Sequence, residues 1–281
     1  MPAIDARGWP GLKSIGEAHA GLFPAYGLHP MFLAGHGVAH LHELHRWIER
    51  ERPLAIGECG LDFYVDGLDR DAQHAFFDAQ LRMARDFELP VILHARRAVD
   101  AVIAAIRRVG GLRGVVHSFP GSRQQAETLW NMGFLLGIGG PVTYERAQRL
   151  RKLVATMPLD HLLLETDSPD QPDCAHRGRR NEPARLVHVL HAVATLRDES
   201  PEEVARATTR NAERLFGLPS ARAGDYRFGL SRSSIALATA ANAKAPVMCV
   251  AAPSPAPQSS LSADSPVACG RTPQTVPSAC G

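Results

Sequence analysis

The chain has 281 residues, of which 45% are hydrophobic, and a formal net charge of +2. This length suits one barrel-sized domain or two smaller domains. No stretch approaches the roughly 20 consecutive apolar residues of a membrane helix, and no signal peptide opens the chain, so we expect a cytoplasmic protein. The five cysteines include no C-x-x-C pair, which argues against a disulfide framework and against a zinc–thiolate site.

The charges and the histidines are unevenly distributed along the chain. Five basic and two acidic residues lie beyond Gly217, so residues 1–217 are nearly neutral. Such a domain lacks the broad basic face of a protein that binds nucleic acid tightly, and a polyanionic substrate would be held by a few local cations. All 13 histidines precede residue 192, which is a mild indication of metal chemistry.

A boundary is predicted near residue 218, where an apolar helical end is followed by Gly217 and Pro219. Beyond it the composition shifts to Ala, Ser and Pro. Such a segment buries too little surface to offset its ordering entropy. We therefore expect a folded domain over residues 1–218 and a low-complexity, disordered tail over residues 219–281.

The elements predicted within the domain alternate between short apolar strands and helices. In chain order they are strands 2–4 and 22–28, helix 37–50, strand 54–58, helix 70–87, strand 91–94, helix 98–109, strand 114–117, helix 122–132, strand 134–138, helix 144–155, strand 162–165, and helices 182–196 and 202–216. Continuous apolar strands are typical of parallel sheets covered on both faces. Seven strands are one short of a (β/α)8 barrel, and a doubly wound sheet also fits this alternation.

Several strands end at their carboxyl edge in a side chain that can bind a metal. Glu58, His94 and His117 each close an apolar run, and a further run leads into Glu165 and Asp167. In a barrel these ends converge on one mouth, where active sites lie. Imidazoles and carboxylates together suit zinc, manganese or iron, which activate water and polarise carbonyl or phosphoryl groups. The alternative is that each histidine is an ordinary hydrogen-bonded residue at a strand end.

Five segments carry a specific resemblance. They are AIGECGLDFY at 55–64, PVILHAR at 90–96, VHSF at 116–119, LETDSP at 164–169 and YGLHP at 26–30. Together they resemble the TatD family of metal-dependent hydrolases, over about residues 1–217 and in the family's order. The resemblance implies an α/β TIM (β/α)8 barrel with one or two divalent cations (Zn, Mn, Mg or Fe). It also implies hydrolysis of ester bonds, with DNA phosphodiesters the best-known substrate class.

The resemblance also implies roles for the residues at the strand ends. Glu58 would bind or bridge the metals, and His94 and His117 would bind one of them. Asp167 would bind the other and accept the proton of the attacking water. Glu58 and Asp167 are therefore the predicted catalytic residues.

Four further residues have a functional and an ordinary interpretation. Arg96 would clamp a phosphate or form a surface ion pair. Asp62 would orient a metal ligand or cap a turn. His29 would face the substrate or pack beneath a loop. Arg177, in the basic segment 176–181, would contact an anionic substrate or lie in a solvated loop.

The sequence departs from the family in one respect. The family's first strand carries a His-x-His metal-binding pair, and no such strand is found here. His40 and His42 fall in a predicted helix, where positions i and i+2 point apart, so we do not expect them to bind one ion. A barrel without its first strand and helix has exposed edges, which predicts reduced stability and weak or absent activity of this chain.

The predicted function is metal-dependent hydrolysis of DNA phosphodiesters, with DNA or a small phosphoester as substrate and no membrane or stable protein partner. Two alternatives remain. The first is a hydrolase of small amides, esters or lactones, and the second is a catalytically impaired remnant.

Overall fold

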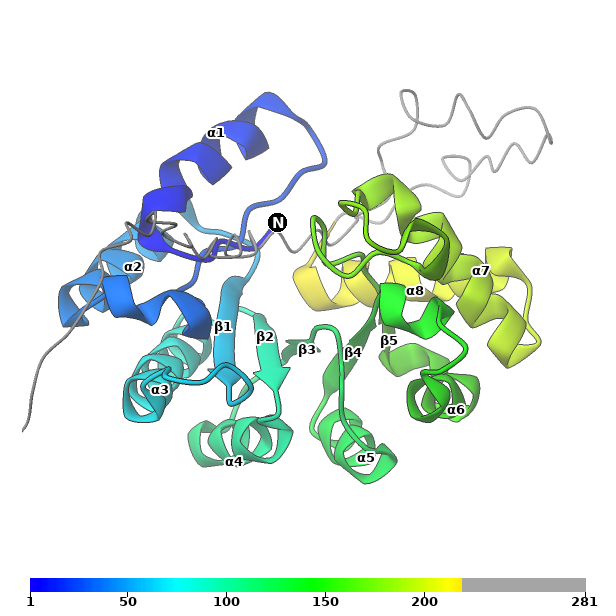
Figure 1. Cartoon of the computed structure of the whole chain (residues 1–281). Coiled ribbons are helices and arrows are strands. Elements are labelled where there is room, and N and C mark those ends of the chain that lie inside the picture. The colour runs from blue at the N-terminus through cyan, green and yellow to red at the C-terminus, as the bar shows by residue number, and fades with distance from the viewer. Residues whose placement is uncertain (219–281) are drawn as a thin grey trace, which may run out of the picture.

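A computed structural model describes residues 1–218 of the chain, and the predicted disordered tail, residues 219–281, lies outside the described residues. Figure 1 shows an α/β structure in which strands in the centre are flanked by helices. Within residues 1–218, no helix has the length and apolar character needed to cross a membrane.

The central sheet is parallel and follows the order of the chain. Its strands are β1 (Ile56–Asp62), β2 (Val91–Arg96), β3 (Gly114–Val116), β4 (Phe134–Ile138) and β5 (Leu162–Leu164), in the order β1-β2-β3-β4-β5. Helices α3 to α6 connect successive strands and lie along one side of the sheet, as Figure 1 shows. This sequential parallel order is that of a barrel and confirms the fold class expected from the sequence.

The helices have the bounds α1 (Trp9–Ala18), α2 (Val38–Glu51), α3 (Arg70–Asp86), α4 (Val99–Val109), α5 (Arg123–Asn131), α6 (Gln148–Thr156), α7 (Leu186–Arg197) and α8 (Pro201–Phe216). Local sequence explains where several of them begin. Asp69 accepts hydrogen bonds from the first-turn amides of α3. Ser200 and Glu203 form a reciprocal capping box at the start of α8, as the Ser-Pro pair predicts.

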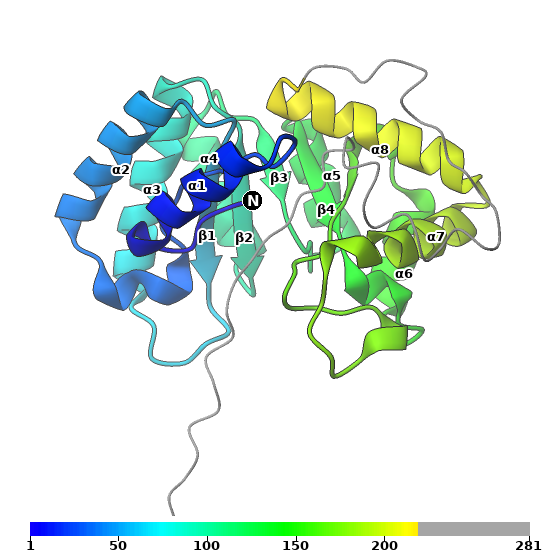
Figure 2. The ribbon, with the colours of Figure 1, turned by 90° about the horizontal axis from the view of Figure 1, so that it is seen from above.

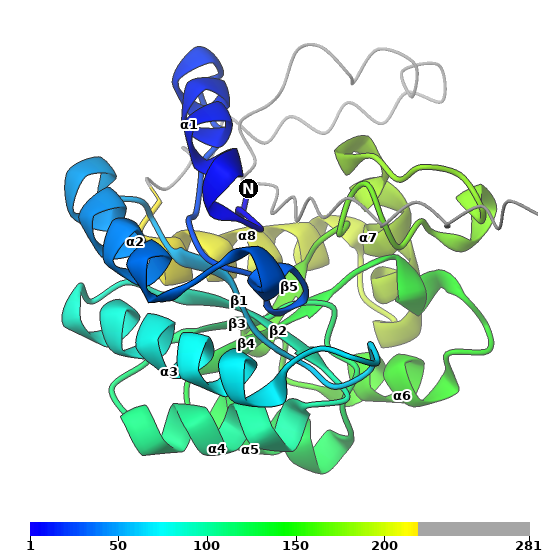
Figure 3. The same ribbon diagram turned by 60° about the vertical axis from the view of Figure 1, so that its left-hand side comes forward.

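The sheet has two apolar faces, which belong to two hydrophobic clusters. One face belongs to the large cluster that includes buried residues of helices α2 to α7. The opposite face contributes alternate strand residues to a smaller cluster that also contains Ala212 and Leu215 of α8. Figures 1 and 3 show α8 on the side of the sheet opposite to α4 and α5, and Figure 2 shows the same elements from above. We call the face next to α8 the inner face, and it leads to the functional site.

Two predicted strands are corrected by the structure. Residues 2–4 and 22–28 are not regular strands but form isolated parallel bridges, Pro2 with Ala25 and Tyr26 with Ile56. Consecutive amides of β1 use different partners, because Gly57 donates to Tyr26 O (3.0 Å) while Glu58 donates to Ala3 O (2.9 Å). Neither segment can build a continuous ladder, although both continue the sheet beyond β1.

Helix α1 has no counterpart among the predicted elements. Its sequence contains Pro10 and two glycines, which weaken any helical signal. It is held in place by Trp9, which is fully buried, packs 5.7 Å from the ring of Trp47 and donates from Nε1 to the carbonyl of Gly27 (3.2 Å). Tertiary packing therefore stabilises this helix.

Candidate metal centre

The inner face of the sheet positions the site. Side chains two residues apart on a strand share a face, so the residue two places beyond each inner apolar residue lies on the same face, nearer the carboxyl edge. Those residues are His94 after Ile92, His117 after Val115, Gly137 after Leu135 and Glu165 after Leu163. The same pleat that buries the inner cluster thus gathers two imidazoles and a carboxylate at one edge.

Gly137 makes room for this group. A Cβ atom at this position would lie 2.7 Å from Oε2 of Glu165 and 2.9 Å from Cα of His117. The second contact is with backbone, which cannot rotate away as a side chain can. A glycine on β4 is therefore required for the two neighbouring strands to bring their side chains together.

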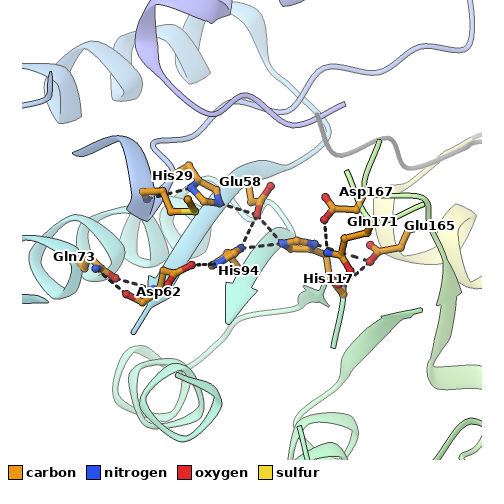
Figure 4. A network of polar contacts seen from close by, with 11 residues as sticks. His29, Glu58, Asp62, Gln73, His94, His117, Glu165, Asp167 and Gln171 are labelled. Atoms are coloured by element: carbon orange, nitrogen blue, oxygen red, sulfur yellow. Dashed lines mark hydrogen bonds and ion pairs between the residues drawn. The ribbon is translucent and has the colours of Figure 1, made fainter. Parts of the chain in front are cut away.

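Glu58 is the centre of the site and is only 1% exposed. Its Oε1 atom lies 2.6 Å from His117 Nε2 and 3.1 Å from His94 Nδ1. The same oxygen lies 3.0 Å from His29 Nε2, as Figure 4 shows. Its other oxygen, Oε2, is buried and accepts no hydrogen bond from any described residue. A buried carboxylate with an unused oxygen is costly unless a cation is its partner.

Asp62 determines which nitrogen of His94 faces Glu58. His94 Nε2 lies 2.9 Å from Asp62 Oδ2 and donates to this carboxylate, which leaves the lone pair of Nδ1 directed at the centre. Asp62 is itself held by the amides of Tyr64 (2.9 Å) and Val65 (3.0 Å), which donate to its Oδ1. Asp62 therefore both caps this turn and orients His94, so the two interpretations of this residue are compatible.

The other two imidazoles face Glu58 in different ways. His117 directs Nε2 at Glu58, while its buried Nδ1 lies 3.9 Å from Oε1 of Glu165 and has no hydrogen-bond partner among the described residues. Nδ1 of His29 accepts from the amide of Met31 (3.2 Å), which places the proton of a neutral ring on Nε2, directed at Glu58. With a cation bound, His94 Nδ1 and His117 Nε2 would direct their lone pairs at it, whereas His29 donates a hydrogen bond to Glu58. Two imidazole nitrogens and a carboxylate are a donor set that fits zinc, manganese or iron.

Asp167 approaches the site from the segment after β5. Gln171 Nε2 donates to Asp167 Oδ2, and Ser118 Oγ donates to Gln171 Oε1 (2.8 Å). The amide of Ser118 also donates to Oε1 of Glu165 (2.5 Å). Figure 4 shows Asp167 on the opposite side of His117 from His94. Ser118 therefore connects both carboxylates after β5 to the end of β3.

The charges of the site shift the pKa values of Glu58 and His117 in opposite directions. Burial opposes ionisation of Glu58, yet the charges of His117 and His29 and their hydrogen bonds hold its pKa well below the ordinary value. Burial likewise lowers the pKa of His117, but the charge and hydrogen bond of Glu58 outweigh it and raise the pKa to about 10. Without a metal, the imidazolium of His117 therefore neutralises Glu58, and a bound cation would replace this positive charge.

The carboxylates after β5 have raised pKa values. Burial raises the pKa of Glu165 to about 7, with a further contribution from the charge of Asp167. Burial and the charge of Glu58 raise the pKa of Asp167 to about 6. Several buried carboxylates this close together repel one another, and a divalent cation among them relieves that repulsion.

The site opens into a cleft of about 780 Å³. Its lining residues include Glu58, His94, His117, Asp167 and His29, together with Arg96, Arg146 and Arg149. Three exposed arginines thus lie beside the carboxylates at the base of the cleft. Arg96 is additionally stacked over the ring of Tyr64, with its guanidinium carbon 3.7 Å from the ring centre. Such a wall suits an anionic substrate.

The structure thus brings together most of the predicted site residues. Arg177 is exposed and does not line this cleft. His40 and His42 lie on α2, as expected, and do not line it either. Arg146, Arg149 and Gln171 were not among the predicted site residues, and Glu165 had been given no role. Of these, only Glu165 had a usable signal, because it follows Leu163 by two positions on one strand.

Comparison with known proteins agrees with this geometry. The family model described as TatD related DNase matches residues 2–217. The chain belongs to this family. It is 38% identical over 222 residues to the uncharacterized metal-dependent hydrolase YjjV of Escherichia coli K12, covering 78% of this chain and 86% of that protein. The crystal structure of that homologue superimposes with a TM-score of 0.75 at 37% identity, with the same coverage.

A second relative carries a more specific name. The chain is 38% identical over 217 residues to the 3'-5' ssDNA/RNA exonuclease TatD of a Pantoea species (strain At-9b), covering 73% of this chain and 82% of that protein. Membership of the TatD family confirms the resemblance drawn from the five sequence segments and identifies the chain as a metal-dependent hydrolase.

Proposed function

We propose that this chain hydrolyses phosphodiester bonds in single-stranded DNA, using divalent cations held by Glu58, His94, His117 and Asp167. The observation that supports the proposal is that His94 and His117 converge on one buried oxygen of Glu58. This group lies beside a cleft that three arginines line. The exonuclease named among the relatives acts on the same class of polymer. Arginine side chains match the geometry and charge of phosphate.

The chain's own residues suit each part of a hydrolytic step. When bound, a divalent cation supplies Lewis acidity toward the phosphoryl oxygen and lowers the pKa of the attacking water. Asp167 would accept the proton of that water, and the hydrogen bond from Gln171 would hold its carboxylate in position. Arg96 and Arg149 would bind the phosphate from the cleft wall, and His29 would keep Glu58 oriented. Arg177 would act, if at all, on a more distant part of the polymer.

The proposal also covers the protein's partners and its location in the cell. Polymer hydrolysis by a single-domain enzyme needs no stable protein partner, and a cytoplasmic location fits a substrate such as DNA. Transient contact with a nucleic acid matches the nearly neutral charge of residues 1–217, because only local arginines face the cleft.

The test is release of nucleotides from a single-stranded oligonucleotide carrying a label at one end. We expect release with Mn²⁺ or Mg²⁺ and none with EDTA. We expect the rate to be low, because within residues 1–218 no His-x-His pair lies on a strand. Asp167→Asn should abolish release, whereas His191→Ala, on the exposed part of α7, should not change it.

Other outcomes would overturn the proposal in distinguishable ways. Metal-dependent cleavage of small esters or lactones without DNA cleavage would favour a small-molecule hydrolase. Bound metal with no activity on either substrate class would favour an impaired enzyme. Activity that persists in Asp167→Asn would exclude the assigned site.

A further inference from the structure

A second group of metal-binding side chains lies outside the cleft described above. Asp173, His176 and His188 each offer one ligand atom, and the three atoms lie within 4.8 Å of one another. Asp173 is 2% exposed, while the two histidines are accessible to solvent. None of the three lines the cleft of the metal centre. The family resemblance assigned no role to this group.

The spacing of these side chains is close to that of the ligands around a bound zinc ion. His176 Nδ1 lies 2.9 Å from Asp173 Oδ2, and the rings of His176 and His188 are 5.3 Å apart at their centres. Two ligands of a tetrahedral zinc ion, each about 2.1 Å from it, are about 3.4 Å apart. The Asp173–His176 pair, at 2.9 Å, needs to open by only about 0.5 Å to reach this spacing. Only His188 must turn toward the pair, and its exposure on α7 allows a rotamer change without repacking.

Asp173 is a fixed anchor for such a site. Its Oδ1 accepts from the amide of Ala175 (3.0 Å), and its backbone carbonyl accepts from the Tyr144 hydroxyl (3.3 Å). A buried, oriented carboxylate loses little conformational entropy when it binds an ion. The third ligand comes from a separate element, since His188 lies in the first turn of α7. An ion here would therefore join two segments of the chain.

We propose that Asp173, His176 and His188 form a second divalent-cation site, best matched to Zn²⁺, that fastens the segment after β5 to helix α7. The ion takes the place of the proton that His176 Nδ1 shares with Asp173, and water completes its coordination. Asp167 lies in the same segment, six residues before Asp173.

The neighbouring positive charges do not prevent binding. Arg177, Arg179 and Arg180 follow His176, and all three side chains are exposed. Charges on exposed side chains interact in a high dielectric and are weakened by water and salt. Asp173, by contrast, is buried and acts on the ion at contact distance, where screening is weak.

The test measures the number of Zn²⁺ ions bound per chain by dialysis and elemental analysis, using the full chain. His188→Ala and His176→Ala should each lower the affinity of this site at least about tenfold. They should therefore bind close to one ion fewer at a Zn²⁺ concentration just sufficient to saturate the unmodified chain. His191→Ala is the matched control, because His191 is exposed on the same helix but outside the group. It should bind as many ions as the unmodified chain.

The metal centre around Glu58 is intact in all these proteins, so the difference between them reports the second site alone. A thermal melt provides an independent reading, because Zn²⁺ stabilises a protein whose folded state binds it. The stabilisation by Zn²⁺ should be smaller in His188→Ala than in His191→Ala. Equal ion counts and equal shifts in all variants would overturn the proposal, as would an equal loss in the His191→Ala control.

Discussion

The Glu58 group and the Asp173 group use the same ligand chemistry in different surroundings. Around Glu58 every candidate ligand is largely buried, and His94 and His117 each face a further carboxylate through the nitrogen that points away from Glu58. Around Asp173 only the carboxylate is buried, and both histidines reach solvent.

Burial therefore distinguishes the proposed catalytic centre from the proposed structural site. Buried ligands have their orientations and protonation states set by neighbours, which a catalytic metal requires. Exposed ligands can rearrange and exchange with water, which suffices for holding two segments together. The predictions below test this contrast, beginning with the largest expected effect.

The largest effect is expected from Glu58→Gln. The substitution keeps the shape of the side chain but removes the negative charge on which three imidazoles converge. We expect kcat/KM for oligonucleotide hydrolysis to fall by about 1000-fold or more, or about 4 kcal/mol. Steady-state kinetics with saturating Mn²⁺ would measure it, and a loss below tenfold would contradict the central place given to Glu58.

The next effect concerns Asp62→Asn. An amide in place of the carboxylate can donate to His94 Nε2, which moves the ring proton to Nδ1 and removes the lone pair directed at the centre. We expect metal affinity to fall by about 10- to 100-fold. Competition with a fluorescent chelator would measure it. Unchanged affinity would mean that Asp62 serves only to cap the turn.

Gly137→Ala tests the packing that brings β3 and β5 together at the centre. The added methyl group would meet Cα of His117 at 2.9 Å, and we expect the free energy of unfolding to fall by about 1–3 kcal/mol. Urea denaturation would measure it. Gly139→Ala is the matched control, because its Cβ would come no closer than 3.4 Å to a neighbour. Equal stability of the two variants would show that the strands adapt freely.

The smallest effect is expected on the exposed wall of the cleft. Arg149→Ala removes one positive charge from a solvent-screened position, so we expect KM for an oligonucleotide to rise by about tenfold while kcat changes little. The salt dependence of kcat/KM should become shallower. Arg107→Ala, an exposed residue of α4 away from the cleft, is the control. A matching change in the control would attribute the effect to net charge alone.

Much of the sheet and of the site was predictable, because both follow from local pattern. The apolar runs that end in Glu58, His94 and His117 predicted strands and ligands together, since a parallel strand and its polar end are adjacent in sequence. The predicted strand 134–138 matches β4 in both bounds. Predicted helices 70–87 and 98–109 differ from α3 and α4 by one residue at one end.

The features that were missed depend on contacts between distant segments. Helix α1 is stabilised by the packing of Trp9 against Trp47 despite its glycines. Arg149 reaches the cleft only because of how α6 is placed beside the end of β3. The partner of Asp167, Gln171, is close in sequence, but a turn of unpredicted shape determines which way it faces. Three-dimensional placement, and not residue type, identifies these residues.

The assignment of Glu58, His94 and His117 as metal ligands is tested most directly by locating a bound metal. Crystals of the protein soaked in Mn²⁺, with anomalous diffraction recorded near the manganese absorption edge, would show where the ion lies. We predict an anomalous peak in contact with Glu58, His94 Nδ1 and His117 Nε2. Well-ordered crystals with these side chains resolved but no peak among them would contradict the assignment of this group as the metal centre.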